Sequence, residues 1–292
     1  MGANWKRTLA RTLVAGILMM GAVAVAHAQG MGQAAPSTPG QTAVPSGDAS
    51  KGNSMALDIA PPVNAEEDAA FKSYQDTSAA DAVKKIELGE AFAQKYPASR
   101  YLPAIYSNLT MLYLSTNQVQ KMEDVGDKEV RLVPTDVQTM AILAQTIPRA
   151  LGGNTSSADA QKELAKAEDY SKRAIDVTPT ISKPASLTDQ QFADAKNATL
   201  AMAHSGLGLV YLKRGKSSDA IPELEQSVKL DPSPDPVNYY LLGLANQKVS
   251  HFAEAADAFN KCAAIQGSMQ DTCKSGAEQA KKLSNTQLSV PK

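Results

Sequence analysis

A segment near the C-terminal end of the chain repeats after 35 residues, and this repeat restricts the possible folds more than any other feature. Four positions recur at the same offset, since Leu207, Gly208, Ala220 and Leu224 return as Leu242, Gly243, Ala255 and Phe259. A unit of this length holds about two helices and cannot bury its apolar face alone. Neighbouring units therefore have to stack on one another, and the repeat predicts an extended helical array.

The spacing within the first copy resembles the tetratricopeptide repeat (TPR). A Leu-Gly-x-x-Tyr segment from Leu207 and an Ala-x-x-x-Leu segment from Ala220, followed by Pro232, fall at the positions that this family uses. Gly208 and Ala220 are small enough to let two helices approach, and the larger side chains fill the seam between them. The resemblance implies an all-α fold, a right-handed superhelix of antiparallel helix pairs.

Further units can be aligned on either side of the clear pair. We expect repeats at about 103–136, 137–180, 198–234 and 236–267, preceded by a divergent helix pair at 65–97 and followed by a capping helix at 270–284 and a flexible tail at 285–292. A Thr-x-x-Gln capping box at Thr188 predicts one long helix that reaches Lys213. Residues 65–284 are thus predicted to form a single helical domain.

The first 64 residues differ from the rest. Three basic residues precede an apolar run at 13–26, which ends in the small-x-small pattern that a signal peptidase cuts after Ala28. The run is shorter than the roughly 20 residues that a membrane-spanning helix needs, so we favour a cleaved signal peptide at 1–28 over an uncleaved anchor. The Gly-, Pro- and Ser-rich stretch at 29–64 is predicted to be a disordered linker. These features predict a periplasmic or secreted protein with no integral membrane span after cleavage.

The net charge argues against nucleic acid as a partner. Loss of the signal peptide removes three basic and no acidic residues, which changes the net charge from −1 to −4. A mildly acidic chain without a basic stripe is not expected to bind nucleic acid.

Cys262 and Cys273 are the only cysteines. In an oxidising compartment we predict a disulfide that joins the last repeat to the capping helix, with two free thiols as the alternative.

No catalytic constellation is visible in the sequence. His204 and His251 are the only histidines after the signal peptide, and they lie in different repeats without acidic or cysteine ligands at metal-binding spacing. No nucleophile elbow, phosphate loop or dinucleotide fingerprint occurs. We therefore expect no enzyme activity, no metal and no cofactor; a hydrolase or carbohydrate-binding role at the cell wall would rest on location alone.

The resemblance implies a concave groove lined by the first helix of each unit, a surface on which such proteins hold peptides or helices. Transferred position by position, the groove-lining candidates are Met111, Leu114, Gln145, Ser205, Leu209, Leu212, Tyr240, Leu244 and Gln247. This set is mostly apolar and uncharged, and only Arg149, Lys213 and Lys248 are candidates to clamp a carboxylate. We predict a scaffold that binds a protein or peptide segment of another envelope protein.

A second hypothesis comes from residues 95–101. Their sequence, KYPASRY, resembles the ends of repeat units in outer-membrane assembly lipoproteins. This resemblance implies a structural component of an outer-membrane or cell-envelope assembly complex.

Overall fold

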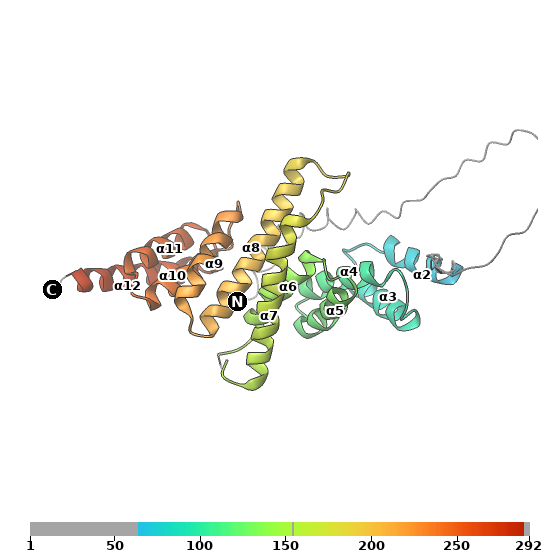
Figure 1. The fold of residues 1–292 in the computed structure, drawn as a ribbon, viewed down its shortest axis with the longest axis horizontal. Coiled ribbons are helices and arrows are strands. Elements are labelled where there is room, and N and C mark those ends of the chain that lie inside the picture. The colour runs from blue at the N-terminus through green and yellow to red at the C-terminus, as the bar shows by residue number, and fades with distance from the viewer. Residues whose placement is uncertain (1–63, 154, 289–292) are drawn as a thin grey trace, which may run out of the picture.

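The computed structural model describes residues 64–153 and 155–288, and these residues form helices without a β-strand. In chain order the α-helices are α2 (Ala65–Asp76), α3 (Ala82–Lys95), α4 (Leu102–Ser115), α5 (Val119–Leu132), α6 (Val137–Ala150), α7 (Ala158–Val177), α8 (Asp189–Lys213), α9 (Ser217–Leu230), α10 (Pro236–Lys248), α11 (Phe252–Ala264) and α12 (Gln270–Leu288), with a short 3-10 helix, η1 (Thr178–Thr180), after α7. Figure 1 shows them following one another along an elongated body, from α2 at one end to α12 at the other. The predicted all-α fold is confirmed.

Two predictions concern the N-terminal segment and the membrane. The predicted signal peptide at 1–28 and the predicted linker at 29–64, except its last residue Asn64, lie outside the described residues. The first described helix, α2, begins at Ala65. Within the described part of the chain, no helix combines the length and the apolar composition needed to cross a lipid bilayer.

Polar side chains fix where several helices begin. Asn64 and Asp136 accept hydrogen bonds from backbone N–H groups in the first turns of α2 and α6. At α8 the backbone N–H of Gln191 donates to Oγ1 of Thr188 at 3.2 Å, and the N–H of Thr188 donates to Oε1 of Gln191 at 3.0 Å. These reciprocal bonds are the predicted capping box, and the helix runs to Lys213 as predicted.

The same turn joins the two helices of a unit in three places. Asn117, Gly215 and Ser250 each have a positive φ, of 60°, 75° and 64°. In each turn the N–H of this residue donates to the carbonyl oxygen three residues earlier, and the following N–H donates to the carbonyl oxygen five residues earlier. This is the Schellman arrangement that ends many helices. Because Gly215 and Ser250 are 35 residues apart, the turn follows the sequence period although only one of the two residues is glycine.

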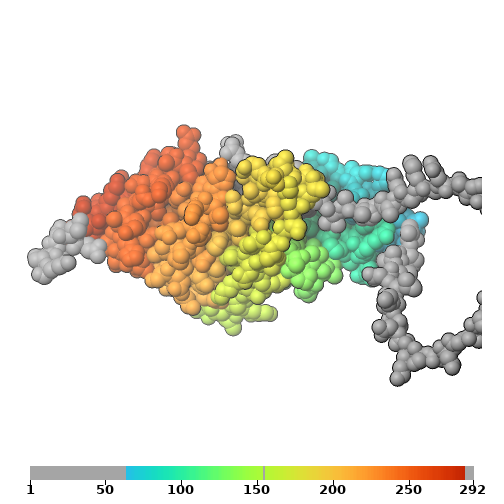
Figure 2. Space-filling model, turned by 45° about the horizontal axis from the view of Figure 1, so that its top comes forward, coloured from blue at the N-terminus to red at the C-terminus, as the bar shows by residue number. Residues whose placement is uncertain are grey.

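Small residues of the first helices receive large side chains of their neighbours. A Cβ atom at Gly208 of α8 would lie 2.7 Å from Cγ of Leu224 on α9. In the next unit the ring of Phe259 on α11 lies between Gly243 of α10 and Gly276 of α12, where Cβ atoms would lie 2.7 Å and 2.9 Å from its Cδ1. Figure 2 shows the resulting stack as successive bands of colour along the body. Tight interlocking of this kind fixes how the two helices of a unit meet and, through Phe259 and Gly276, how the last unit meets α12.

The last helix, α12, packs on α11 and closes the C-terminal end of the stack. The buried Cys262 and Cys273 form a disulfide between the two helices, with a Cα–Cα distance of 5.7 Å. The predictions that this helix ends at 284 and that a flexible tail starts at 285 are wrong, because α12 continues to Leu288. The sequence contains no glycine or proline between 284 and Pro291 that would stop the helix.

At the other end, residues 95–101 attach α2 to the stack. Phe71 of α2 stacks on Tyr101, with ring centroids 4.0 Å apart and planes 8° from parallel. The hydroxyl of Tyr101 donates to Oδ1 of Asp68 at 2.6 Å, and Nη2 of Arg100 donates to the same oxygen at 3.0 Å. Side chains of the KYPASRY segment are therefore used in packing between helices.

Candidate interaction surface

The positions predicted to line a groove lie on one face of each first helix, because they are spaced by three and four residues. Six of these side chains are partly accessible in the structure, namely Met111, Gln145, Leu212, Tyr240, Leu244 and Gln247. Each of the helices α4, α6, α8 and α10 contributes at least one of them. The structure thus presents a series of mostly uncharged side chains from successive units.

The other three residues, Leu114, Ser205 and Leu209, are buried, and the prediction that they line an open groove is wrong. Ser205 and Leu209 are covered because α10 packs against α8. Oγ of Ser205 donates to Oδ1 of Asn238 on α10 at 2.6 Å, and Leu209 belongs to an apolar cluster that includes residues of α10. Leu114 lies in the core of the N-terminal part. First helices in this chain are packed more closely than a position-by-position transfer from the family assumes.

Two of the three cations that were candidates for a carboxylate clamp contact groups within the stack. Nη1 of Arg149 lies 3.2 Å from Oδ2 of Asp235. Nζ of Lys213 donates to the carbonyl oxygen of Leu151 at 2.9 Å, and burial lowers the pKa of Lys213. Lys248 is exposed at the end of α10. Arg149 and Lys213 therefore serve contacts inside the molecule.

The two described histidines lie in different surroundings. Nδ1 of His204 lies 2.7 Å from Oε2 of Glu223, a contact that joins α8 to α9. His251 is exposed and directly precedes α11. Across residues 64–153 and 155–288, no three His, Cys, Asp or Glu side chains are arranged to hold a metal ion. Neither histidine is part of a ligand cluster in this region.

Two carboxyl groups on α5, which were not predicted to be site residues, have strongly raised pKa values. Glu129 is 2% exposed, and burial together with the nearby carboxylate of Asp136 raises its pKa to about 8. Burial also raises the pKa of Glu123 to about 7. Nζ of Lys166 on α7 lies 2.5 Å from Oε1 of Glu123 and 2.6 Å from Oδ2 of Asp127. These groups make the contacts of α5 with α6 and α7, so we assign them to packing.

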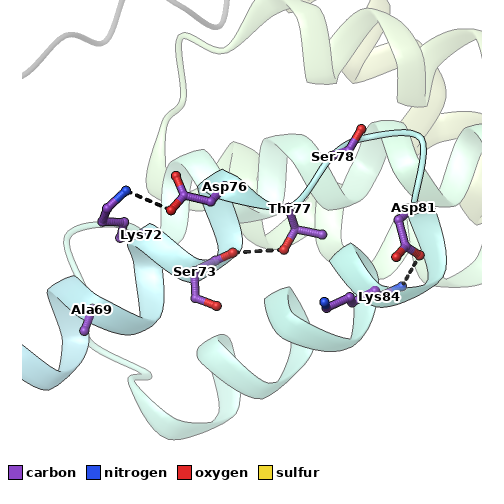
Figure 3. Close-up of a pocket in the computed structure, with 8 residues that line it drawn as sticks. All are labelled: Ala69, Lys72, Ser73, Asp76, Thr77, Ser78, Asp81 and Lys84. Carbon is purple, nitrogen blue, oxygen red and sulfur yellow. Dashed lines mark hydrogen bonds and ion pairs between the residues drawn. The ribbon is translucent and has the colours of Figure 1, made fainter.

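A shallow hollow lies at the turn between α2 and α3, and Figure 3 shows the side chains around it. It is lined by Ala69, Lys72, Ser73, Asp76, Thr77, Ser78, Asp81 and Lys84. Nζ of Lys72 pairs with Oδ2 of Asp76 at 2.8 Å, and Asp81 accepts the N–H of Lys84 at 3.3 Å as the cap of α3. These bonds stabilise helix ends, and none of the predicted partner-binding residues lies here.

Comparison with known proteins agrees with the repeat pattern. Residues 203–234 match the family model described as tetratricopeptide repeat. The matched residues comprise the second half of α8 and all of α9. No match was found among curated proteins. Similar solved structures include TTC0263, a thermophilic TPR protein of Thermus thermophilus, with 17% identity over 73% of this chain and 98% of that chain and a TM-score of 0.44. Another is the MamA RS-1 ArsTM double mutant, with 15% identity over 78% and 99% and a TM-score of 0.49. The family match and the repeated turn geometry make the fold an all-α, TPR-like stack.

Proposed function

We propose that the chain is an extracytoplasmic scaffold that binds a segment of another envelope protein and catalyses no reaction. The observation that carries this proposal is the series of partly accessible, uncharged side chains on successive first helices. It includes Met111 on α4, Leu212 on α8, and Tyr240, Leu244 and Gln247 on α10. Regularly spaced apolar positions on a helical stack suit an extended or helical peptide with apolar anchors.

The side chains on α10 are the strongest candidates for contact with a partner. The ring of Tyr240 lies 5.7 Å from the ring of Phe259, centroid to centroid, and Leu244 packs on the same cluster. Both side chains are held by the core on one side while part of their surface stays accessible. An aromatic anchor fixed in this way loses little conformational entropy on binding. Gln247 adds a hydrogen-bonding group one turn further along.

Two features support a location outside the cytoplasm. The basic and apolar pattern of residues 1–28 has the form of a cleavable signal. The disulfide between Cys262 and Cys273 is of the kind that persists in oxidising compartments. Both features point in the same direction although they lie at opposite ends of the chain.

Site-specific crosslinking tests the surface. A photoreactive amino acid at Leu212 or Gln247, on first helices, is compared with the same amino acid at Gln226, an exposed position on the second helix α9. We expect a discrete crosslinked partner from the first-helix positions and none from Gln226. Identical products from all three positions, or none from any, would reject the assignment of this face.

The alternative role in an assembly complex has no separate structural support. Residues 95–101, which suggested it, hold α2 through the contacts of Arg100 and Tyr101. Packing accounts for these residue types without an external partner. We therefore keep the general scaffold as the proposed function.

A further inference from the structure

Arg149 connects the first helices of three successive units. It lies on α6, and its Nη1 pairs with Oδ2 of Asp235, the N-cap of α10, at 3.2 Å. Its Nη2 donates to Oγ of Ser205 on α8 at 3.2 Å and to Oδ1 of Asn238 on α10 at 3.3 Å. Arg149 and Asp235 are 86 residues apart in sequence. The two residues thus lie on either side of the whole α8–α9 unit in the sequence.

The side chain of Arg149 bridges two helix steps of the stack. Packed helices are 8–10 Å apart, so two steps from α6 to α10 would separate their axes by roughly 16–20 Å. Arg149 lies in the last turn of α6, and Asp235 directly precedes α10. The contact therefore joins the C-terminal end of α6 to the N-terminal end of α10. Arg149 therefore spans α8 and links the units on either side of it.

The layer beneath Arg149 is buried and hydrogen-bonded. Ser205 and Asn238 are 1% and 3% exposed, and Oγ of Ser205 donates to Oδ1 of Asn238. Nδ2 of Asn238 donates to Oγ of Ser227 on α9 at 3.1 Å. A buried polar network that is hydrogen-bonded in this way favours one geometry over others, because a shifted helix would leave buried polar groups without partners. Arg149 donates hydrogen bonds to Ser205 and Asn238 and so belongs to this network.

We propose that Arg149 is a conformational latch, whose bonds to Asp235 and Asn238 hold α6 and α10 together over α8 and fix the curvature of the stack. The side chains of Arg149 and Asp235 are only 12% and 18% exposed, so solvent and salt screen their attraction less than that of a surface pair. Loss of the pair opens the angle between the α6–α7 and α10–α11 units. This inference concerns the shape of the free molecule and goes beyond the proposed binding function.

The distance between the two halves of the stack tests the latch. Spin labels are attached through Ser115→Cys at the end of α4 and Asn260→Cys on α11, both exposed positions on either side of α8. The two native cysteines are bonded to each other and do not react. We expect Arg149→Met to lengthen and broaden the distance distribution measured by pulsed electron resonance.

Three further variants complete the test. Asp235→Asn removes the charge but keeps an N-cap side chain for α10, and it should shift the distances in the same direction. Arg149→Lys keeps the charge but loses the two-pronged geometry, so an intermediate shift is expected. Lys72→Met is the matched control, because Lys72 pairs with Asp76 on its own helix, and it should leave the distances unchanged.

Wild-type distances in folded Arg149→Met and Asp235→Asn would overturn the proposal. If Arg149→Met does not fold, Asp235→Asn decides the outcome alone, because it retains the cap and changes only the charge. Circular dichroism of each labelled variant establishes that its helices are formed before distances are compared.

Discussion

Gly206 of α8 lies directly against the backbone carbonyl of Ala144 on α6. A Cβ atom at Gly206 would be 2.5 Å from the carbonyl oxygen and 2.6 Å from the carbonyl carbon, closer than real Cβ atoms approach. The obstacle is main chain, which cannot rotate away as a side chain does. The crossing of α6 and α8 therefore requires glycine at this position, and it lies next to Ser205 in the network beneath Arg149.

We expect Gly206→Ala to lower the free energy of unfolding by about 1–3 kcal/mol, the usual cost of overpacking. Alanine is about 1 kcal/mol more favourable than glycine within a helix, so a net loss means that the clash outweighs this gain. Urea denaturation followed by circular dichroism measures the difference.

Gly152→Ala is the control for this variant, because a Cβ atom at Gly152 would meet nothing within 4 Å. Gly152→Ala should change the free energy of unfolding by no more than about 0.5 kcal/mol. If Gly206→Ala is as stable as Gly152→Ala, the α6–α8 crossing adjusts at little cost and the requirement for glycine is refuted.

Glu129 should make the protein less stable as pH rises. Its pKa is about 8 in the fold against an ordinary value of 4.5, so the native chain keeps a proton that the unfolded chain releases between these two values. The contribution of Glu129 is fully present below about pH 4.5 and is lost as pH rises through about 8. Stability should fall in this window by up to about 1.4 kcal/mol per pH unit, and Glu123, whose pKa is about 7, acts in the same direction.

Glu129→Gln isolates this effect, because glutamine has the same shape and never ionises. We expect the variant to be more stable than the wild type at pH 8 and to show a smaller slope between pH 6 and 8. Denaturant midpoints at several pH values measure it. Glu87→Gln, at an exposed position on α3, is the control and should keep the wild-type slope. Equal slopes in both variants would contradict the assignment.

The helix pairs were predictable because their determinants are local. The small residues Gly208 and Ala220, set at fixed distances from large ones, specify how α8 meets α9. The capping box at Thr188 specifies where α8 begins. Such features repeat within 35 residues, so a single sequence reveals them.

The contacts between units that are far apart in sequence were not predictable in the same way. They include the contact between Arg149 and Asp235, which are 86 residues apart, and the approach of Gly206 to Ala144. Neither contact is part of the repeat pattern. The resulting close packing is why Ser205 is buried instead of lining a groove.

One buried group did leave a signal in the sequence. Met122, Gly126 and Glu129 are spaced by four and three residues, which places Glu129 on the same face of α5 as two buried residues. The spacing therefore puts a carboxyl group among core positions. Its neighbour Asp136 lies beyond the next turn, and only the folded chain shows that the two are close.

Export predicts a defined mature end. If residues 1–28 are a cleaved signal, the protein isolated from the envelope fraction of its host should begin at Gln29, which N-terminal sequencing or intact mass measures. Ala28→Arg should block cleavage because the peptidase needs a small residue there, whereas Ala34→Arg, beyond the site, should not. A mature chain that retains Met1 in both cases would contradict the prediction.

Reduction of the disulfide should loosen one end of the stack and leave the rest intact. Cys262 and Cys273 are 11 residues apart, and the loop-entropy model assigns about 3 kcal/mol to a link of this length. Because each unit contacts mainly its neighbours, the loss should concentrate in α11 and α12. Hydrogen exchange measured with and without reductant should show faster exchange of α12 amides and unchanged exchange in α6.

The control is the variant with both Cys262→Ala and Cys273→Ala. It should show fast exchange in α12 without reductant and no further change when reductant is added, since no bond remains to be broken. An α12 that stays equally protected in the reduced wild type would mean that packing of Phe259 between Gly243 and Gly276 holds this helix by itself. The disulfide would then contribute nothing to the closure of the stack, and the stabilising role assigned to it would be wrong.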